Sequence, residues 1–135
     1  MGQNLFDDAE VIYAYTRRQA IEDGVLVDFM QDELRELVRQ AGFRFPIAMT
    51  TTSFSVAVAT EGEELPEGQD IKGRAWDVLN MLRWAVNTAP RGTDTLFFKV
   101  KVWNGRHHTV VKLKAVCGPS DDGSPCITIM FPDED

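Results

Sequence analysis

Cysteine and histidine are scarce in this sequence. The cysteines are Cys117 and Cys126, and the two histidines, His107 and His108, are neighbours in the chain. Two thiols are too few for a disulfide framework or for a zinc site made of four thiolates. If both histidines lie in a strand, they point to opposite faces and cannot easily bind one metal ion together. We therefore expect neither a metal site nor a bound cofactor.

Long apolar runs and an excess of positive charge are also missing. No stretch approaches the roughly 18 to 20 apolar residues that cross a bilayer, and residues 1–8 lack a basic region followed by an apolar one. These absences predict a cytoplasmic protein without a membrane segment. There are 14 Lys and Arg against 21 Asp and Glu, a formal net charge of -7. Affinity for nucleic acid rests on cationic side chains, so this balance argues against direct nucleic-acid binding.

No catalytic constellation is recognisable, and no glycine loop has the setting that binds phosphate. Glu22, Asp23 and Asp28 are candidates for acid–base chemistry, but no nucleophile or histidine adjoins them. Asp121 and Asp122 offer two carboxylates to a cation, yet they lack the ligand spacing of a calcium loop, and a turn is the favoured explanation. We assign no catalytic residue. A small enzyme with a site assembled from scattered Asp, Arg and His residues remains an alternative.

The chain does contain enough apolar sequence for a folded core. It has 135 residues, of which 44% are hydrophobic and 26% charged, close to ordinary globular composition. We expect a single domain over residues 1–135. Residues 1–9 form a loose lead-in in this interpretation, and residues 132–135 form an acidic tail.

The stretch Ala20–Asp28, AIEDGVLVD, combines a helix end, a glycine turn and a strand. Gly24 can adopt the positive φ that ends a helix without a Cβ penalty. Val25–Asp28 then has the β-branched and apolar composition of a short, half-buried strand. We therefore expect Gly24 to be a structural position at a corner of the fold.

The residues before this corner allow two interpretations. Thr16 with Gln19 is a capping-box pattern and predicts a helix over 17–23, preceded by a short strand over 11–15. One continuous helix over 9–23 is the alternative.

After the corner, apolar residues at helical spacing predict a helix over 33–41 that stops at Gly42. Residues 43–49 are interrupted by proline and are expected to be extended. Residues 53–59 are compatible with a short helix or a strand. Residues 61–70 are acidic, contain glycine and proline, and are expected to form a solvated loop.

The most apolar helical pattern runs over residues 71–88. We expect this helix to be central and contacted on more than one side. Trp76 and Trp84 are interpreted as core or rim residues rather than a platform for stacking bases. Trp76 and its neighbour Asp77 are treated as structural positions.

Asn104–Gly105 is a strong hairpin signal between the strand patterns 95–103 and 106–115. A two-residue loop predicts that Phe98 faces Val111, which gives one apolar face and one face carrying four lysines. Residues 126–131 alternate as a third strand with Ile127, Ile129 and Phe131 inward. Cys117 and Cys126 then lie on opposite faces, which argues against a disulfide between them.

The expected fold is therefore α+β. An antiparallel three-stranded meander over about 95–131 packs against a central apolar helix over about 71–88. Additional N-terminal helices and short strands complete the domain.

Four segments together resemble a known family. They are 15–28 with its AIEDGVLVD motif, 41–43 with Pro46 and Thr50, 73–79, and 117–123. These segments are similar to an uncharacterised family of small acidic proteins encoded by bacterial plasmids and phages, a domain of unknown function. The resemblance implies a mobile-element setting, in which small proteins often blunt host defences such as restriction or CRISPR systems. It transfers no catalytic residue.

Charge is distributed unevenly along the chain. Residues 1–36 contain nine acids against three arginines, and residues 61–70 add five more acids, whereas residues 95–117 contain five cations and no acid. We expect an electrostatically two-sided molecule unless the basic strands are covered by an acidic element. The candidate partner-binding residues are Glu22, Asp23, Asp28, Asp32, Glu36, Lys99, Lys101 and Lys112.

Two non-catalytic functions follow as hypotheses. The favoured one is a protein that binds and inhibits a host protein or nucleoprotein machine of the restriction or CRISPR type through its charged surfaces. The other is an accessory or regulatory protein of plasmid or phage maintenance that acts through protein contacts. A deep pocket with convergent polar groups would favour the enzyme, and a broad charged or apolar patch would favour the inhibitor.

Overall fold

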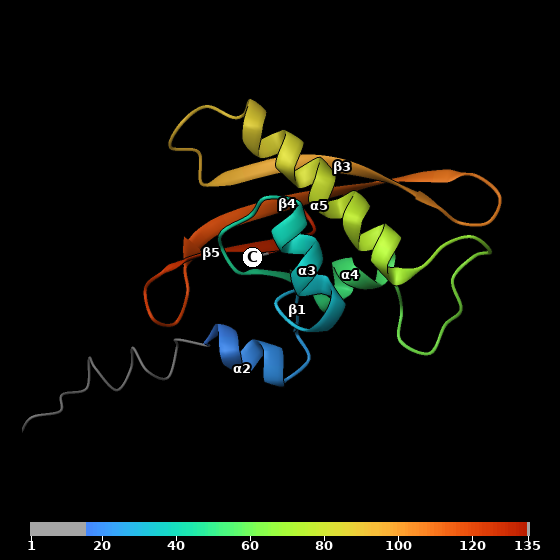
Figure 1. Cartoon of the computed structure of the whole chain (residues 1–135), viewed down its shortest axis with the longest axis horizontal. Helices are drawn as coiled ribbons and strands as arrows, with labels where there is room; N and C mark the ends of the chain where they lie inside the picture. Colours follow the sequence, from blue (N-terminus) through green and yellow to red (C-terminus); the bar gives the residue numbers. More distant parts are fainter. Residues whose placement is uncertain (1–15, 135) are drawn as a thin grey trace, which may run out of the picture.

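A five-stranded mixed sheet with helices packed on it forms the body of the molecule (Figure 1). The computed structural model describes residues 16–134. Its elements are α2 (Arg17–Glu22), β1 (Leu26–Asp28), α3 (Asp32–Gln40), β2 (Ile47–Thr50), α4 (Thr51–Ala57), α5 (Ile71–Thr88), β3 (Thr95–Trp103), β4 (His108–Pro119) and β5 (Pro125–Met130). The expected α+β class and the central helix are confirmed.

The strand order is β1-β2-β5-β4-β3. The predicted meander is therefore present as β3, β4 and β5, joined by antiparallel pairing. β2 extends the sheet by pairing parallel to β5, and β1 pairs antiparallel to β2. The N-terminal short strands thus belong to the same sheet as the meander, which the sequence did not indicate.

The core lies between one face of this sheet and helices α3, α4 and α5. Phe98, Val100, Leu113 and Ile129 are buried there, as their alternation along the strands predicts. α5 begins and ends at the predicted residues, and the Asp70 side chain caps it by accepting a hydrogen bond from Gly73 N at 2.7 Å.

α5 packs against β3, α3 and α4, and one strip of its surface is exposed. Val78, Leu79 and Leu82 are fully inaccessible, whereas Trp84 is 63% exposed. Trp84 follows Leu82 by two positions, which places it about 200° away around the helix. The expected contacts on more than one side are therefore present, Trp76 is partly buried against the core, and Trp84 lies on the exposed strip of the helix.

The hairpin has a longer turn than predicted. Phe98 pairs with Leu113, and Trp103 pairs with His108, so the register is shifted by two residues and the loop spans 104–107. Asn104 Oδ1 accepts hydrogen bonds from Arg106 N at 2.9 Å and His107 N at 3.0 Å, and Gly105 has φ 101°. These bonds close a wider loop, so the predicted two-residue turn was wrong. A two-residue shift keeps each strand side chain on its predicted face, whereas His107, predicted opposite Val102, lies in the loop and is exposed.

The helix ends predicted at Gly24 and Gly42 are confirmed. Gly24 has φ 77° and Gly42 has φ 88°. At the end of α2, Gly24 N donates to Ile21 O and Val25 N donates to Ala20 O, and α3 ends with the same pair of bonds. This is the Schellman arrangement, in which glycine takes the left-handed position.

α2 begins at a complete capping box. Thr16 accepts from Gln19 N, and the Gln19 side chain accepts from Thr16 N. Thr16 is extended, with φ -72° and ψ 152°, so a helix running without interruption through Thr16 is excluded. The proposed strand over 11–15 and the lead-in over 1–9 lie outside the described residues. Residues 53–59 mostly belong to helix α4, which starts from the cap at Thr50.

The second face of the sheet is covered over β5 and exposed over β3 and β4. Arg17 of α2 donates to Thr128 Oγ1 and Ile127 O, and Cys126 is buried. Phe97 is 68% exposed on the hairpin part of this face. Cys117 and Cys126 are both free thiols on opposite faces of the sheet, as predicted.

Candidate functional site

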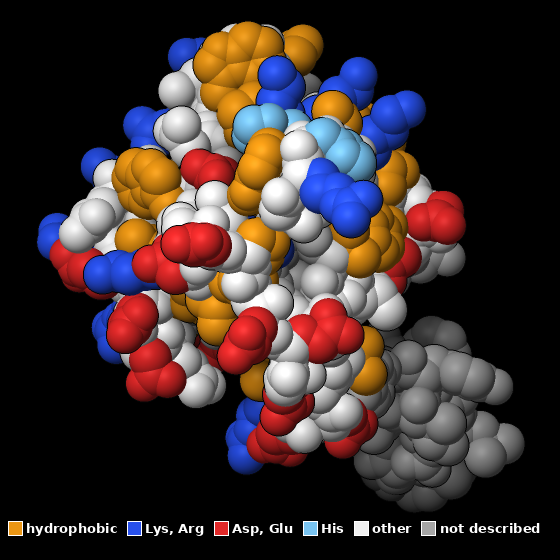
Figure 2. All heavy atoms as spheres, turned by 90° about the vertical axis from the view of Figure 1, so that its right-hand side faces the viewer, with side chains coloured by type: hydrophobic (Ala, Val, Ile, Leu, Met, Phe, Trp, Pro, Cys, Tyr) orange, Lys and Arg blue, Asp and Glu red, His pale blue; other side chains and the backbone are white. Residues whose placement is uncertain are grey.

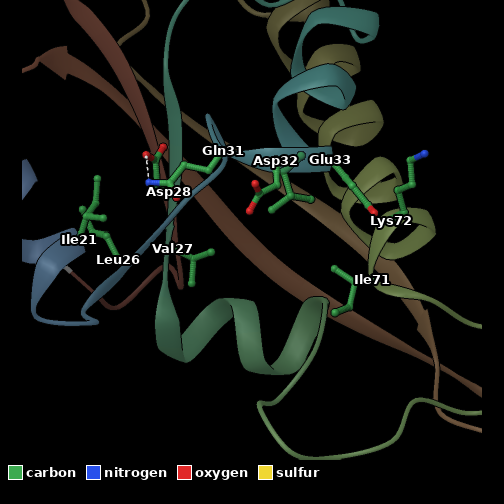
Figure 3. A pocket seen from close by; sticks show the side chains of 10 residues that line it. Ile21, Leu26, Val27, Asp28, Gln31, Asp32, Glu33, Ile71 and Lys72 are labelled. Atoms are coloured by element: carbon green, nitrogen blue, oxygen red, sulfur yellow. Dashed lines mark hydrogen bonds between the residues drawn. The ribbon is translucent and has the colours of Figure 1, made fainter.

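An open groove lies where β1 ends and where α3 and α5 begin (Figure 3). Its volume is about 1040 Å³. The walls come from α2, β1, α3 and α5, with Val27, Asp28, Asp32, Glu33, Ile71 and Lys72 among the lining residues and Ile21 as the contribution of α2. We call this site the acidic groove.

Asp28 is held in place by the turn that follows β1. Its Oδ1 accepts a hydrogen bond from Met30 N at 2.9 Å, and its Oδ2 accepts one from Gln31 Nε2 at 3.3 Å, drawn as a dashed line in Figure 3. The Asp28 carboxylate therefore shapes the entry into α3 as well as lining the groove.

Asp32 has an unusual backbone. Its φ is 53°, the one positive value at a non-glycine position among residues 16–134. Aspartate tolerates this region better than most residues, but the conformation still stores strain, and such strain is concentrated at functional sites. The strained turn places the Asp32 carboxylate in the lining of the groove. In Figure 3, Asp32 lies between Asp28 and Glu33.

The acidic surface continues into the 61–70 loop. A second, shallower hollow shares Glu33, Ile71 and Lys72 with the groove and adds Glu64 and Asp70. Asp70 is engaged as the cap of α5. Asp32, Glu33 and Glu64 have no hydrogen bond or ion pair with another residue in the described part of the chain, so their charges face solvent.

The other predicted acidic residues lie outside the groove. Glu22 pairs with Arg18 at 3.2 Å on α2, and Asp23 caps the end of that helix. Glu36 pairs with Arg39 on α3, and the hydrogen bond from Arg39 lowers the pKa of Glu36 below its usual value. The structure thus brings together Asp28 and Asp32 of the predicted acids.

The predicted basic residues form a separate surface. Lys99, Lys101 and Lys112 are exposed on the outer face of the hairpin, and Lys99 lies opposite Lys112. Neither ion pair found within residues 16–134 involves them. In Figure 2 the two histidines lie with several Lys and Arg side chains above most of the acids in view. Within residues 16–134, no acidic element covers these lysines of β3 and β4.

Sequence reasoning missed Glu33, Ile71 and Lys72. Glu33 was treated as the favourable acid of a helix start, and Ile71 and Lys72 as the first turn of α5. Nothing local signals that the two helix starts are neighbours. The lysine directly after an apolar residue at the predicted helix start, Ile71–Lys72, was the one hint in the sequence.

Two segments that carried the family resemblance prove to be structural. Within 73–79, Arg74 is buried and donates to Val58 O and Trp103 O, while desolvation lowers its pKa. Desolvation also raises the pKa of Asp77, although that residue is exposed. Within 117–123, Asp121 accepts hydrogen bonds from Arg17 N at 2.9 Å and Arg18 N at 3.0 Å. Asp121 therefore caps α2 from a distant loop.

The Asp122 carboxylate forms hydrogen bonds within its own turn. It accepts hydrogen bonds from the hydroxyls of Ser120 and Ser124, which hold its pKa well below the usual range. Within residues 16–134, no group of three or more His, Cys, Asp or Glu side chains is placed to hold a metal ion.

The acidic groove is suited to electrostatic recognition. It offers carboxylates beside partly exposed apolar side chains and one lysine, and its lining includes no histidine or cysteine. Such a surface complements Lys and Arg side chains of another macromolecule. In the described part of the chain, no helix is both long and apolar enough to cross a membrane.

Comparison with known proteins identifies a family without a described activity. No curated protein and no solved structure matches the chain. A family described as a family of unknown function (DUF6573) matches residues 2–135. Because this match spans almost the whole sequence, the chain belongs to that family of unknown function.

Proposed function

We propose that this protein binds a basic surface of a host protein or nucleoprotein complex through the acidic groove, and acts without catalysis. The observation that carries the proposal is the convergence of Asp28, Asp32 and Glu33 on one open groove, next to a hollow that shares Glu33 and is lined by the 61–70 loop. Asp32, Glu33 and Glu64 form no ion pair within residues 16–134, and Lys72 is the one cation that lines the groove with Asp32 and Glu33, so most of their field is available to a partner.

The shape of the groove supports a macromolecular partner. It is wide and open, and its apolar residues Leu26 and Ile71 lie among the carboxylates. Protein interfaces combine apolar contact with charge complementarity in this way, and the charges mainly raise the association rate and the specificity. A basic protein surface that normally holds nucleic acid is the natural complement.

The finer proposal concerns the biological setting. We infer that the protein belongs to a plasmid or phage and inhibits a host defence machine of the restriction or CRISPR type. Its support is the resemblance of the AIEDGVLVD and neighbouring segments together with the acidic surface. An accessory role in plasmid or phage maintenance through protein contacts is the alternative, and the lysine face of the hairpin with exposed Phe97 supplies its surface.

The test combines capture of a partner with a defence assay in bacteria. The acid variant carries Asp32→Asn, Glu33→Gln and Glu64→Gln, which remove charge and keep side-chain shape. Asn tolerates the positive φ at position 32, so the backbone is preserved. The matched control carries Lys99→Gln, Lys101→Gln and Lys112→Gln. Circular dichroism and thermal melting establish that both variants are folded.

We expect the wild type and the lysine variant to retain one basic partner at low salt and to raise the survival of a targeted plasmid. The acid variant should lose both effects, and high salt should weaken capture of the partner. Equal capture by the acid variant would contradict the acidic groove as the binding surface. A changed rate of plasmid loss without any change in defence would favour the maintenance role.

A further inference from the structure

A separate pocket, distinct from the acidic groove and the hollow beside it, lies between the C-terminal ends of α3 and α5 and the sheet. Its volume is about 500 Å³, within the roughly 300–1,000 Å³ of typical small-molecule sites. Lys72 of the acidic groove and Arg83 of this pocket are at different ends of α5, roughly 16 Å apart along its axis at 1.5 Å per residue. The pocket is therefore separate from the groove, and we call it the arginine pocket.

The inner walls of the arginine pocket are apolar. Leu82 of α5, Ala115 of β4 and Ile127 of β5 line it and are themselves buried. Phe45 and Val86 stand nearer its mouth, with 41% and 39% of their surfaces exposed. Water in contact with these walls is displaced favourably by an apolar ligand body.

Three arginines from three segments stand around these walls: Arg44 after α3, Arg83 on α5 and Arg91 in the loop after α5. Arg83 Nη1 donates to Ala41 O, the carbonyl at the end of α3. A Cβ at Gly42 would overlap Arg83 Nη1, so Gly42 permits this close approach as well as the helix end. Arg83 is therefore anchored at the pocket and retains further N–H donors of its guanidinium.

The positive charge of the pocket is only partly balanced. Arg44 and Arg91 have no hydrogen bond or ion pair with another described residue. Asp94 is the one acid in the lining, and its Oδ1 accepts a hydrogen bond from Thr95 Oγ1 at 3.3 Å. Three guanidinium groups against one carboxylate make the mouth attractive to an anion.

We propose that the arginine pocket binds a small molecule with an anionic head, a carboxylate or a phosphate, attached to an apolar body. The head lies among Arg44, Arg83 and Arg91, whose guanidinium groups can form bidentate hydrogen bonds with a carboxylate or a phosphate. The body fills the apolar interior against α5 and the sheet. This inference does not depend on the function proposed for the acidic groove.

The pocket carries its own reporter. Cys117 lines it and is exposed, whereas Cys126 is buried on the opposite face of the sheet. A thiol reagent such as 5,5′-dithiobis(2-nitrobenzoate) should therefore modify Cys117 first, and the Cys117→Ser variant identifies its signal. A bound ligand should slow this modification. The probes are decanoate and decyl phosphate, with decanol and inorganic phosphate as matched probes that lack the head or the body.

We expect decanoate or decyl phosphate to slow labelling of Cys117 at concentrations well below about 1 mM, and the two matched probes to have no effect in that range. The more effective of the two active probes identifies the head. Arg44→Gln and Arg91→Gln should each weaken protection roughly tenfold. Asp94→Asn should strengthen it, because it removes the opposing charge. Lys101→Gln, on the other face of the sheet, should leave it unchanged.

Protection is expressed as the ratio of labelling rates with and without probe for each variant, so that changes in thiol reactivity cancel. Equal protection by decanol and decanoate would overturn the anionic assignment. Absence of protection by both decanoate and decyl phosphate at about 1 mM would overturn the site. Weaker protection in Asp94→Asn than in the wild type would also contradict the proposal.

Discussion

At the scale of single residues, Gly24 and Gly42 perform the same task under different constraints. Both end a helix with positive φ. A Cβ at Gly24 would meet no atom within 4 Å, whereas one at Gly42 would overlap the Arg83 guanidinium. The requirement for glycine is therefore purely conformational at Gly24, and both conformational and steric at Gly42.

We predict that Gly24→Ala lowers the free energy of unfolding by about 1 kcal/mol, because alanine is strained at φ 77°. Gly24→Asn should cost clearly less, since asparagine tolerates the left-handed region. Urea denaturation of the three proteins measures both differences. Equal stability of the Gly24→Ala variant and the wild type would show that this corner relaxes to another conformation.

At the scale of elements, Arg74 joins α5 to two neighbours. Its Nη1 donates to Val58 O at 2.9 Å after α4, and its Nη2 donates to Trp103 O at the end of β3. The residue is 8% exposed, and among residues 16–134 no carboxylate pairs with it. Arg74 is therefore a structural cross-link whose charge is balanced by carbonyl groups.

We predict that Arg74→Met lowers the free energy of unfolding by about 2–5 kcal/mol, because the buried Val58 carbonyl and the partly buried Trp103 carbonyl lose their donors. Arg74→Lys should recover only part of the loss, since one ammonium group cannot reproduce the two hydrogen bonds that the planar guanidinium donates to separate carbonyls. The exposed Arg91 serves as control, and Arg91→Met should stay within about 0.5 kcal/mol of the wild type. Chemical denaturation that ranks Arg74→Met with Arg91→Met would refute the cross-link.

The hairpin shows how far pattern reasoning reaches at this scale. Alternation placed Phe98, Val100 and Leu113 inward correctly, because successive side chains of a strand point to opposite faces of the sheet whatever its register. It did not place their partners, because the loop length depends on the side chain of Asn104, which closes a four-residue turn. Register thus needed the geometry of a single turn.

At the scale of the whole molecule, Glu134 links the end of the chain to its middle. Its carboxylate accepts hydrogen bonds at 2.8 Å each from Thr50 Oγ1, Thr52 Oγ1 and Phe131 N. Burial raises the pKa of Glu134, but these hydrogen bonds outweigh it and leave the pKa below the usual 4.5. The segment expected to be an acidic tail is therefore attached at this residue to the start of α4.

This attachment predicts a pH dependence. A carboxyl with a folded-state pKa below its unfolded-state pKa stabilises the fold above the unfolded value of 4.5, and this stability is lost as the pH falls through the folded value. Glu134→Gln should therefore cost about 1 kcal/mol at pH 7, with a shrinking difference from the wild type below about pH 4.5. Melting curves between pH 7 and pH 3 measure this, and a constant difference would contradict it.

The sequence by itself determined the features that depend on residues within about four positions of each other. These are the capping box at Thr16, the helix ends at Gly24 and Gly42, the bounds of α5 and the alternation of the meander strands. Their hydrogen bonds and apolar faces are local, so propensity and spacing predict them.

Only the tertiary structure decided which elements became neighbours. The parallel pairing of β2 with β5, the meeting of Asp28, Asp32 and Lys72 in the acidic groove, and the gathering of Arg44, Arg83 and Arg91 all join segments that are distant in sequence. Their positions follow from burying the apolar faces of the sheet and helices together. This burial is non-directional, so no local pattern records which charged residues it brings to the same surface.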